Sequence, residues 1–302
     1  MKLLCALVCT AMLLPAASAS AASVPRFGHV FVIVGENTSY SEVTAAHAPY
    51  ITGTLRPRGA WLTNHHTFPK SSSLGQYIAM VSGQFTSCEA NNQLPAHCHQ
   101  DVPNLFGQLA ATGRTWRDWQ ESMPSPCYRK DAGLPSRHNE YGAHHNPALY
   151  FTGLKSSCRA NSLPMGGTGA KSTGAFDAAL KSGDVGDFNL VVPNDCENGH
   201  DPCGGDPVRH FDAFLKREVP KIEASPAFGS HGVIVVTWDE GDDPPKDPAH
   251  VATLLLGPLV RPGRVDRTRH SHFGLERTLA EGFGVAPVAH AKTARAITSV
   301  WR

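Results

Sequence analysis

The sequence predicts an α/β fold, built as a single domain with a mostly parallel central sheet and helices on both faces. Residues 29–37 and 232–240 are apolar, mostly β-branched runs, as expected of strands buried on both faces of a parallel sheet. Segments with strand and helix patterns alternate along the chain, which is the order that places a parallel sheet between helical layers. No internal repeat or heptad pattern points to another architecture.

The N-terminal segment has the pattern of a secretory signal peptide. Lys2 precedes an apolar stretch over residues 3–14, and small residues with Ala-x-Ala cleavage options follow over 16–22. The apolar stretch is shorter than the ~20 residues needed to cross a bilayer, so we expect cleavage rather than a membrane anchor. We assign residues 1–22 to the signal peptide and 23–302 to the folded domain, and expect the mature protein to be secreted.

The remaining cysteines agree with export. Cys5 and Cys9 leave with the signal peptide, and six cysteines remain. An even number in an exported chain indicates disulfides rather than free thiols. Zinc binding by thiolates is the alternative, but no Cys-x-x-Cys pair is present. Closeness along the chain favours the pairs Cys88–Cys98, Cys127–Cys158 and Cys196–Cys203.

The charge balance excludes a general attraction to polyanions. The chain has 27 basic and 26 acidic residues, for a formal net charge of +1. A nearly neutral chain has no overall electrostatic reason to bind nucleic acid or a membrane surface. We therefore expect no nucleic-acid partner, no stable membrane insertion and a monomer that acts on a small substrate.

Local patterns predict the remaining elements between and after the two long strands. Helices are expected over residues 48–55, 75–81, 105–111, 211–222 and 275–283. Further strands are expected over residues 115–120, 188–192 and 253–256, the last two ending at Pro193 and at Gly257-Pro258. The Gly/Ser-rich residues 156–174 predict a long loop. We expect this loop to lie within one domain, because the strands with the functional residues lie on either side of it.

Oxygen ligands follow both long strands at their carboxyl ends, where ligands bind in open α/β sheets. If the strands are neighbours, Glu36 and Asn37 converge with Asp239 and Glu240. Carboxylates this close repel one another unless a cation neutralises them. Asn and Asp also form ordinary turns, but two such pairs at matched strand ends favour a divalent metal. Oxygen ligands suit Ca, Mg or Mn, and a nearby histidine admits Zn.

A serine run precedes the helix predicted over residues 75–81. A hydroxyl at a helix N-terminus lies among backbone N–H groups that favour an anion, and an adjacent metal lowers the pKa of that hydroxyl. An ordinary N-cap serine is the alternative interpretation. The run is Ser71-Ser72-Ser73.

Several of the chain's 16 histidines cluster in polar turns, where functional groups tend to lie. Imidazole can bind phosphate oxygens, ligate a metal or protonate a leaving group. Surface histidines with no such role are the alternative. The clusters are His65-His66, His144-His145, His200, and His270 with His272.

Six of these segments, in order from Phe27 to Phe283, resemble the bacterial phosphoesterase family of phospholipases C and secreted acid phosphatases, which belongs to the alkaline-phosphatase-like superfamily. Ser73 and Tyr77 are spaced as in the family's Ser-x-Pro-Asn-Tyr segment, although Gly75 and Gln76 replace its Pro and Asn. The other resembling segments are Glu36-Asn37, His145-Asn146-Pro147, Pro193-Asn194-Asp195 with Gly199-His200-Asp201, Thr237-Trp238-Asp239-Glu240, and Gly257-Pro258 with Ser271-His272-Phe273.

The resemblance implies an alkaline-phosphatase-like fold and a secreted, metal-dependent phosphoester hydrolase, closest to small exported acid phosphatases, some of which act on phosphatidylinositol 3-phosphate. It makes Ser73 the nucleophile that forms a phosphoserine. The implied metal ligands are Glu36, Asn37, Asp239 and Glu240, and the implied catalytic histidines are His145, His200 and His272. The implied substrate is a small phosphoester or a phosphoinositide-like molecule.

Three other functions remain open from the sequence. A phosphodiesterase or phospholipase C would use the same residues with different pocket loops. The second alternative is an exported protein that binds metal or phosphate without turnover, and the third is a structural domain stabilised by disulfides. Neither would need a catalytic nucleophile. A sulfatase is disfavoured, since neither Cys-x-Pro-x-Arg nor Ser-x-Pro-x-Arg occurs.

Overall fold

One nine-stranded sheet forms the centre of the computed structural model, which describes residues 23–68, 71–86, 88, 91–241 and 249–302. The predicted signal peptide lies outside the described residues. The strands are β1 Val30–Gly35, β2 Ala60–His66, β3 Trp116–Gln120, β4 Ser162–Pro164, β5 Phe188–Val192, β6 Val233–Trp238, β7 His250–Leu256, β8 Arg264–Asp266 and β9 His270–Ser271. The helices are α1 Arg56–Arg58, α2 Ser73–Ser82, α3 Leu105–Ala111, α4 Cys158–Asn161, α5 Gly174–Ser182, α6 Pro207–Glu223 and α7 His272–Phe283, with the π-helix η2 Ile51–Leu55.

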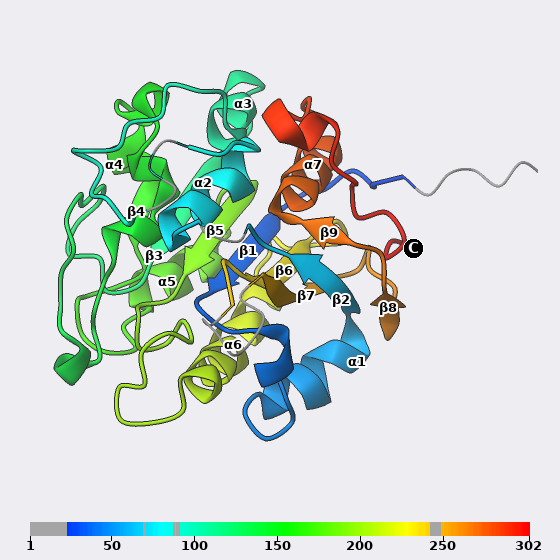
Figure 1. The fold of residues 1–302 in the computed structure, drawn as a ribbon, viewed down its shortest axis with the longest axis horizontal. Helices are drawn as coiled ribbons and strands as arrows, with labels where there is room; N and C mark the ends of the chain where they lie inside the picture. The colour runs from blue at the N-terminus through cyan, green and yellow to red at the C-terminus, as the bar shows by residue number, and fades with distance from the viewer. Residues whose placement is uncertain (1–22, 69–70, 87, 89–90, 242–248) are drawn as a thin grey trace, which may run out of the picture.

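The strand order is β4-β3-β5-β1-β6-β7-β2-β8, and β9 also pairs with β2 (Figure 1). All pairs are parallel except those of β7, which runs antiparallel to β6 and β2. The two long strands of the sequence prediction are therefore parallel neighbours at the centre of the sheet. The predicted mostly parallel α/β fold is confirmed.

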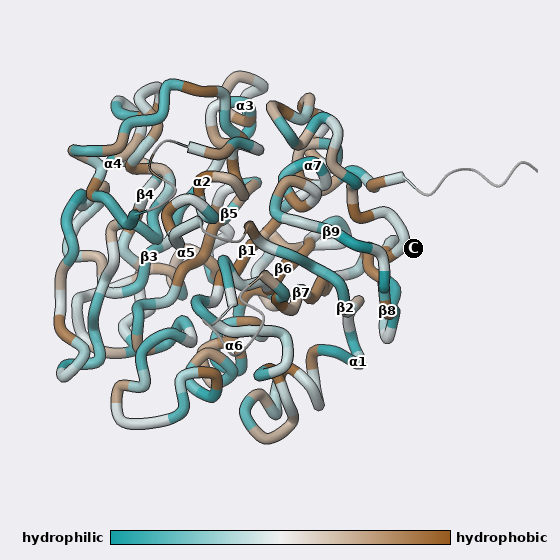
Figure 2. Tube along the Cα trace, in the orientation of Figure 1, coloured by the Kyte–Doolittle hydropathy of each residue, from teal (hydrophilic) through white to brown (hydrophobic). Residues whose placement is uncertain are grey.

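Each face of the sheet is covered by helices, as the burial of β1 on both sides requires. Val30, Val32 and Val34 belong to the core beneath α2, α3 and α7. Phe31 and Ile33 belong to the opposite core, against α6 and η2. The central strands are accordingly the most hydrophobic part of the chain, while the outer loops are largely hydrophilic (Figure 2). The alternation of side chains along a strand explains how one run of apolar residues supplies both cores.

Most of the predicted elements are present with shifted ends. The helix expected over 211–222 begins earlier, because Asp206 accepts a hydrogen bond from the backbone N–H of Arg209 and Pro207 occupies the first helical position. The helix expected over 48–55 is largely π-helical and continues into α1. The helices and strands expected over 105–111 and 188–192 have the predicted bounds.

Several features differ from the prediction, among them the helix α5 over Gly174–Ser182, which the sequence pattern did not indicate. Residues 156–174 are not one long loop, because they contain α4 and the edge strand β4, which pairs with β3. Hydrogen bonding to β3 orders this segment despite its Gly/Ser content. The sequence pattern also missed β2, because its second half, over residues 63–66, is polar and lacks strand-like alternation.

The three predicted disulfides are confirmed. They join Cys88 to Cys98, Cys127 to Cys158, and Cys196 to Cys203. Within the ranges that the structure describes, no helix has both the length and the apolar character that crossing a bilayer requires.

Candidate active site

The register of β1 and β6 brings the two acidic strand ends together. Gly35 lies opposite Trp238 in the parallel pair, so Glu36 and Asp239 leave the sheet side by side. Both residues are almost completely buried. Carboxylates normally remain in water, so their burial at adjacent strand ends marks this edge of the sheet as a candidate site.

The predicted nucleophile reaches the same place from α2. Ser73 is the first residue of α2, directly after the N-cap Ser72. Its Oγ lies 2.6 Å from Oε1 of Glu36 and 3.0 Å from Oε1 of Glu240. One hydroxyl has a single proton to donate, while ionised carboxylates only accept. The hydroxyl therefore cannot satisfy both acids at once when they are ionised.

The acids strongly perturb one another. Glu36, Asp239 and Glu240 each offer an oxygen within 4.8 Å of the others. Burial, followed by the charges of Glu36 and Glu240, raises the pKa of Asp239 well above its usual value. Burial acts to raise the pKa of Glu36 as well, but the charge and hydrogen bonding of His145 outweigh it and lower this pKa to about 2.

The donor set fits a hard divalent cation. Asn37 Oδ1 and Asp239 Oδ2 are buried and have no hydrogen-bond partner among the described residues. Asn37 has a left-handed backbone (φ 43°), a conformation that Asn tolerates better than most residues, and its backbone N–H lies 3.3 Å from Asp239 Oδ1. Carboxylate and amide oxygens are the ligands that Ca, Mg and Mn prefer. A cation at this position would neutralise the repulsion between the carboxylates and would contact the two oxygen atoms that have no hydrogen-bond partner.

His145 lies between two carboxylates at the centre of this cluster. Its Nε2 is 2.9 Å from Oε2 of Glu36, and its Nδ1 is 3.0 Å from Oδ1 of Asp195. Burial opposes its protonation, but the two acids raise its pKa well above the usual value. The buried ring of Tyr77 packs near it, with centroids 5.4 Å apart. The two acids therefore favour the protonated, positively charged form of His145.

His272 joins the site through the backbone. Its Nε2 donates to the carbonyl oxygen of Asp239 at 2.7 Å, and its Nδ1 faces Nε2 of His65 at 3.3 Å. The carbonyl can only accept, so His272 carries its proton on Nε2 and His65 donates to Nδ1. Burial lowers the pKa of His272 to about 4 and that of His65 well below its usual value. Both rings are neutral and hold Asp239 in place.

The structure does not bring His200 into this cluster. Its side chain is 44% exposed and its Nδ1 lies 2.8 Å from Oδ1 of Asp201. It belongs to the loop over 194–201, which borders the site because Asn198 accepts the backbone N–H of Glu36 at 2.8 Å. Its neighbour on this loop, Asp195, is the one that reaches His145.

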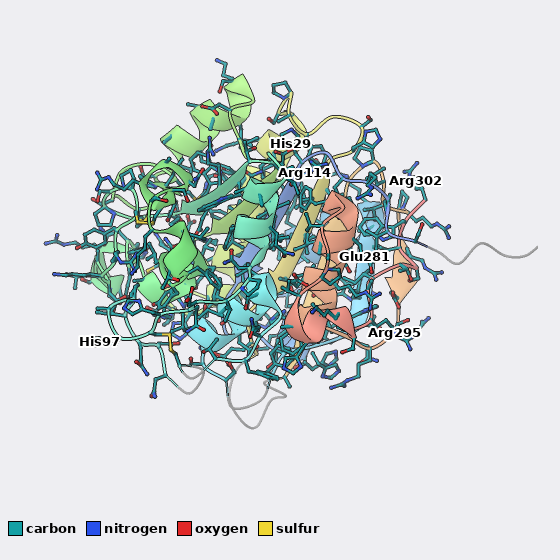
Figure 3. The ribbon with its side chains drawn as sticks, turned by 90° about the horizontal axis from the view of Figure 1, so that it is seen from above. His29, His97, Arg114, Glu281, Arg295 and Arg302 are labelled. Carbon is teal, nitrogen blue, oxygen red and sulfur yellow. A yellow bond between two sulfur atoms is a disulfide. The ribbon has the colours of Figure 1, made fainter. Side chains whose placement is uncertain are left out.

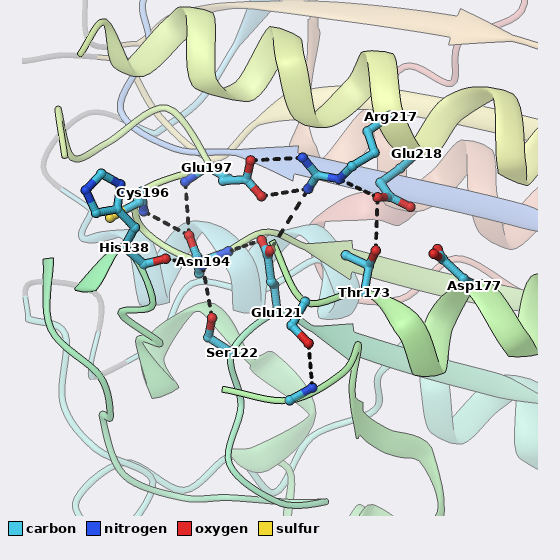
Figure 4. Close-up of polar contacts among 12 residues, drawn as sticks. Glu121, Ser122, His138, Thr173, Asp177, Asn194, Cys196, Glu197, Arg217 and Glu218 are labelled. Carbon is cyan, nitrogen blue, oxygen red and sulfur yellow. Dashed lines mark hydrogen bonds and ion pairs between the residues drawn. The ribbon is translucent and has the colours of Figure 1, made fainter. Parts of the chain in front are cut away.

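A network of buried acids around the partly exposed Arg217 fixes that loop (Figure 4). Arg217 of α6 binds both carboxylate oxygens of Glu197, at 3.0 and 2.6 Å, and its NH2 group lies 4.0 Å from Oε1 of Glu121. Glu121 in turn accepts the backbone N–H of Asn194 at 3.1 Å. This network anchors the residues on both sides of Asp195, so α6 positions the partner of His145.

Sequence reasoning missed four contributors to the site: Asp195, His65, Tyr77 and Arg217. The Asn194-Asp195 pair after β5 and the His65-His66 doublet were visible signals, but neither pattern identifies which residue faces inward. Tyr77 appeared only as a spacing marker for Ser73. Arg217 had no local signal, since it lies on an ordinary amphipathic helix.

Comparison with protein families gives one match over most of the chain. The model of the Phosphoesterase family matches residues 45–286. A phosphatidylinositol-3-phosphatase of Mycobacterium tuberculosis is 26% identical over 290 residues, covering 95% of this chain and 87% of that protein. A phosphate-repressible acid phosphatase of Penicillium chrysogenum is 24% identical over 241 residues, covering 76% of this chain and 53% of that protein.

Solved structures share the fold at low sequence identity. A protein of the alkaline phosphatase superfamily from Vibrio parahaemolyticus superposes with a TM-score of 0.64 at 13% identity, covering 93% of this chain and 72% of that one. The lipoteichoic acid synthase LtaP from Listeria monocytogenes gives a TM-score of 0.59 at 11% identity, covering 86% and 74% of the two chains. These structures support the alkaline-phosphatase-like architecture expected from the sequence.

Proposed function

This chain belongs to the Phosphoesterase family and is a phosphoric ester hydrolase, and from that premise we propose that it hydrolyses phosphomonoesters through a phosphoserine at residue 73. The observation that carries the proposal is the position of Ser73. Its hydroxyl begins a helix and touches two carboxylates from neighbouring strand ends. No structural requirement explains why a serine should be held against one buried and one partly buried acid.

We assign the metal to Glu36, Asn37, Asp239 and Glu240, which supply the oxygen donors that a divalent cation needs. When bound, the cation would lower the pKa of the Ser73 hydroxyl and offset the negative charge of the phosphoryl group. The Ser73 hydroxyl donates a hydrogen bond to Glu36 at 2.6 Å, which holds Oγ in place, and its proton passes to solvent water as Oγ attacks. Ser73 Oγ forms a bond to phosphorus as the bond to the leaving oxygen breaks, and water later hydrolyses the phosphoserine and releases phosphate.

We assign His145 to the negative charge of the transition state. It is buried and positively charged, 2.9 Å from the acid that faces Ser73, so it can stabilise negative charge on phosphoryl oxygens. The departing oxygen must gain a proton, and we assign His200 to that step as a group on the rim of the site, reached when substrate binds. His272 instead holds the Asp239 backbone, a positioning role.

The substrate class and location remain part of the proposal. A phosphatidylinositol-3-phosphatase is similar over 95% of this chain, which supports a phosphoinositide-like monoester as the substrate. Export is supported by the signal-peptide pattern and by three disulfides, which persist in oxidising compartments. We propose that the mature chain, from about residue 23, acts as a secreted monomer.

Ser73→Ala tests the nucleophile. We expect release of p-nitrophenol from p-nitrophenyl phosphate to fall by at least about a thousandfold, because a covalent step is lost. Ser71→Ala is the matched control, since it removes a hydroxyl from the same run whose hydrogen bond is a 3.4 Å contact with the Ser72 carbonyl. Near-normal turnover by folded Ser73→Ala protein would rule out this nucleophile.

A substrate and metal panel tests the remainder. Protein treated with EDTA should lose activity and regain it with one of Mg, Ca, Mn or Zn. The restored protein should hydrolyse p-nitrophenyl phosphate and phosphatidylinositol 3-phosphate, but not bis-p-nitrophenyl phosphate. Preference for the bis-ester would instead establish a phosphodiesterase that uses the same residues.

A further inference from the structure

A pocket of about 640 Å³ lies away from the acid cluster, at the β8 edge of the sheet. It is lined by the turn between β8 and β9 and by the C-terminal segment, and its volume lies within the range of small-molecule sites. Figure 3 shows Arg295 on this outer side of the molecule. The lining residues that matter are Arg264, Arg267, Arg269, Arg295, Asp266 and Ser299.

Four arginines from three segments line one cavity, and none of them forms an ion pair with Asp266, the one acid among the lining residues. Among the residues that the structure describes, none of the four guanidinium groups has an ion pair or a side-chain hydrogen bond, whereas Arg58, Arg114 and Arg277 elsewhere each pair with an acid. Like charges gathered in one concave site repel one another and attract a counter-ion. The pocket therefore has unused capacity to bind an anion.

The one acid of the pocket, Asp266, is already fully engaged. It is 3% exposed and accepts hydrogen bonds from the Thr268 backbone at 2.7 Å and from Ser299 Oγ at 2.6 Å, with His270 Nε2 at 3.2 Å. These contacts, against the opposing effect of burial, lower its pKa below the usual range. Asp266 ties the β8–β9 turn to the C-terminal segment and so fixes the pocket floor.

The turn is also anchored from the neighbouring strand. The Thr63 hydroxyl donates to the Asp266 carbonyl at 3.2 Å, and the Asn64 side chain donates to the Arg267 carbonyl at 3.1 Å. The backbone that carries the arginines is therefore held in place before any ligand arrives. Such preorganisation reduces the entropy cost of binding.

We propose that this pocket is a second anion site, which binds a compact ligand carrying more than one phosphate group. Guanidinium groups match phosphate oxygens in bidentate pairs, and the positive charge of four of them exceeds the charge of about −1.5 to −2 that one phosphate group carries. The near-neutral charge of the whole chain disfavours long polyanions and favours a ligand confined to this cluster. The ligand is either a free multiply phosphorylated molecule or the same chemistry presented by a lipid headgroup.

The test uses methylenebisphosphonate, which a phosphatase cannot hydrolyse, as a calorimetric probe of the full mature chain. Arg267→Gln with Arg269→Gln should weaken binding about 10- to 100-fold, since each lost charged contact matters. Arg137→Gln with Arg159→Gln is the control, because it removes the same charge from exposed positions elsewhere. Hydrolysis of p-nitrophenyl phosphate should be unchanged in both variants, which separates this site from the acid cluster.

Sedimentation with vesicles of phosphatidic acid, against phosphatidylcholine vesicles, distinguishes the two sources. If the pocket arginines are needed to bind the free probe but the protein does not sediment with the vesicles, the ligand is a soluble molecule. If the pocket arginines are also needed for the protein to sediment with phosphatidic acid vesicles, the ligand is a lipid headgroup. The proposal is overturned if the pocket variant binds the probe as tightly as the parent protein, or if the control variant loses binding equally. Long single-stranded DNA that binds in an arginine-dependent way, in place of the probe, would also overturn it.

Discussion

At the scale of single residues, the site is a set of acids that the fold holds together against their mutual repulsion. Asp239 illustrates this best, because it is completely buried and its pKa is raised by burial and by its acidic neighbours. Asp239 therefore favours the binding of a metal but lowers the stability of the metal-free protein.

Asp239→Asn should raise the melting temperature of the metal-free protein and abolish the rise that metal causes. The substitution removes one repelling charge from a buried cluster, an effect on the order of 1–3 kcal/mol. Calorimetry with and without EDTA measures both changes. Asp201→Asn is the control, since this partly buried loop acid pairs with His200 outside the cluster. An unchanged response to metal in Asp239→Asn would remove Asp239 from the ligand set.

Glu276 gives the protein a pH-dependent stability away from the acid cluster. This α7 side chain is buried, and burial, against the opposing effect of the Val288 backbone, raises its pKa to about 8. The pKa of Glu276 is near 4.5 in the unfolded chain and about 8 in the folded chain. At a pH between these two values, Glu276 has lost its proton in the unfolded chain but keeps it in the folded chain. The free energy of unfolding therefore decreases as pH rises through this window.

Glu276→Gln should remove that decrease. Relative to the parent protein, the variant should gain stability between pH 5 and pH 8, on the order of 2–4 kcal/mol at most. Urea titrations at the two pH values measure the difference. Glu281→Gln serves as the control, because this residue is in the same helix but forms a partly exposed pair with Arg277. A pH-independent difference between Glu276→Gln and the parent would contradict the assignment.

At the scale of elements, α6 supports the site without contributing to its chemistry. It carries Arg217, whose contacts with Glu197 and Glu121 fix the loop that presents Asp195 to His145. The sheet supplies the metal-binding acids, and the helix supplies the geometry of the loop beside them.

Arg217→Met should lower both stability and turnover. Arg217 is partly exposed, but the acids that it contacts are buried, so its removal leaves buried carboxylates unpaired and costs about 3 kcal/mol. At a temperature where the variant is folded, kcat should still fall about tenfold, because Asp195 is no longer held against His145. Lys216→Met, one residue away and exposed, should change neither. A folded Arg217→Met protein with normal kcat would limit Arg217 to a structural role.

The disulfides should differ in their effect with the length of chain that they close. Cys127–Cys158 spans 31 residues and Cys196–Cys203 spans 7, so the loop-entropy estimate favours the first by roughly 1 kcal/mol. Paired serine variants of each bridge, compared by urea unfolding, test this. A larger loss for the shorter bridge would indicate that its anchoring of the 194–201 loop matters more than chain entropy.

At the scale of the whole molecule, metal binding should couple distant parts of the chain. The assigned ligands come from the ends of β1 and β6, which only the folded sheet brings together. A cation that binds the folded state alone stabilises it by about 2.7 kcal/mol at a hundred times its dissociation constant. For a domain of this size the melting temperature should rise by about 5 °C or more.

Differential scanning calorimetry of EDTA-treated protein, with each metal restored in turn, measures that rise. The metal that restores activity should also give the largest shift. Restoration of activity without any thermal shift would mean that the cation does not bind the strand-end acids of the folded protein.

The sequence alone determined the features that depend on local chemistry. Apolar β-branched runs identified the central strands, short cysteine separations identified the disulfides, and the residues after each strand identified Glu36 and Asp239. The strand and disulfide predictions are confirmed because strand burial and short-loop closure are visible within a few residues, whereas the metal-binding role of Glu36 and Asp239 stays a prediction.

Only the tertiary structure decided which residues meet. It placed Asp195 rather than His200 against His145, turned His272 onto a backbone carbonyl, and ordered β4 within a predicted loop. The physical reason is that sheet register, crossover packing and the anchoring of loops by residues such as Arg217 depend on contacts between segments far apart in the chain, which no local pattern encodes.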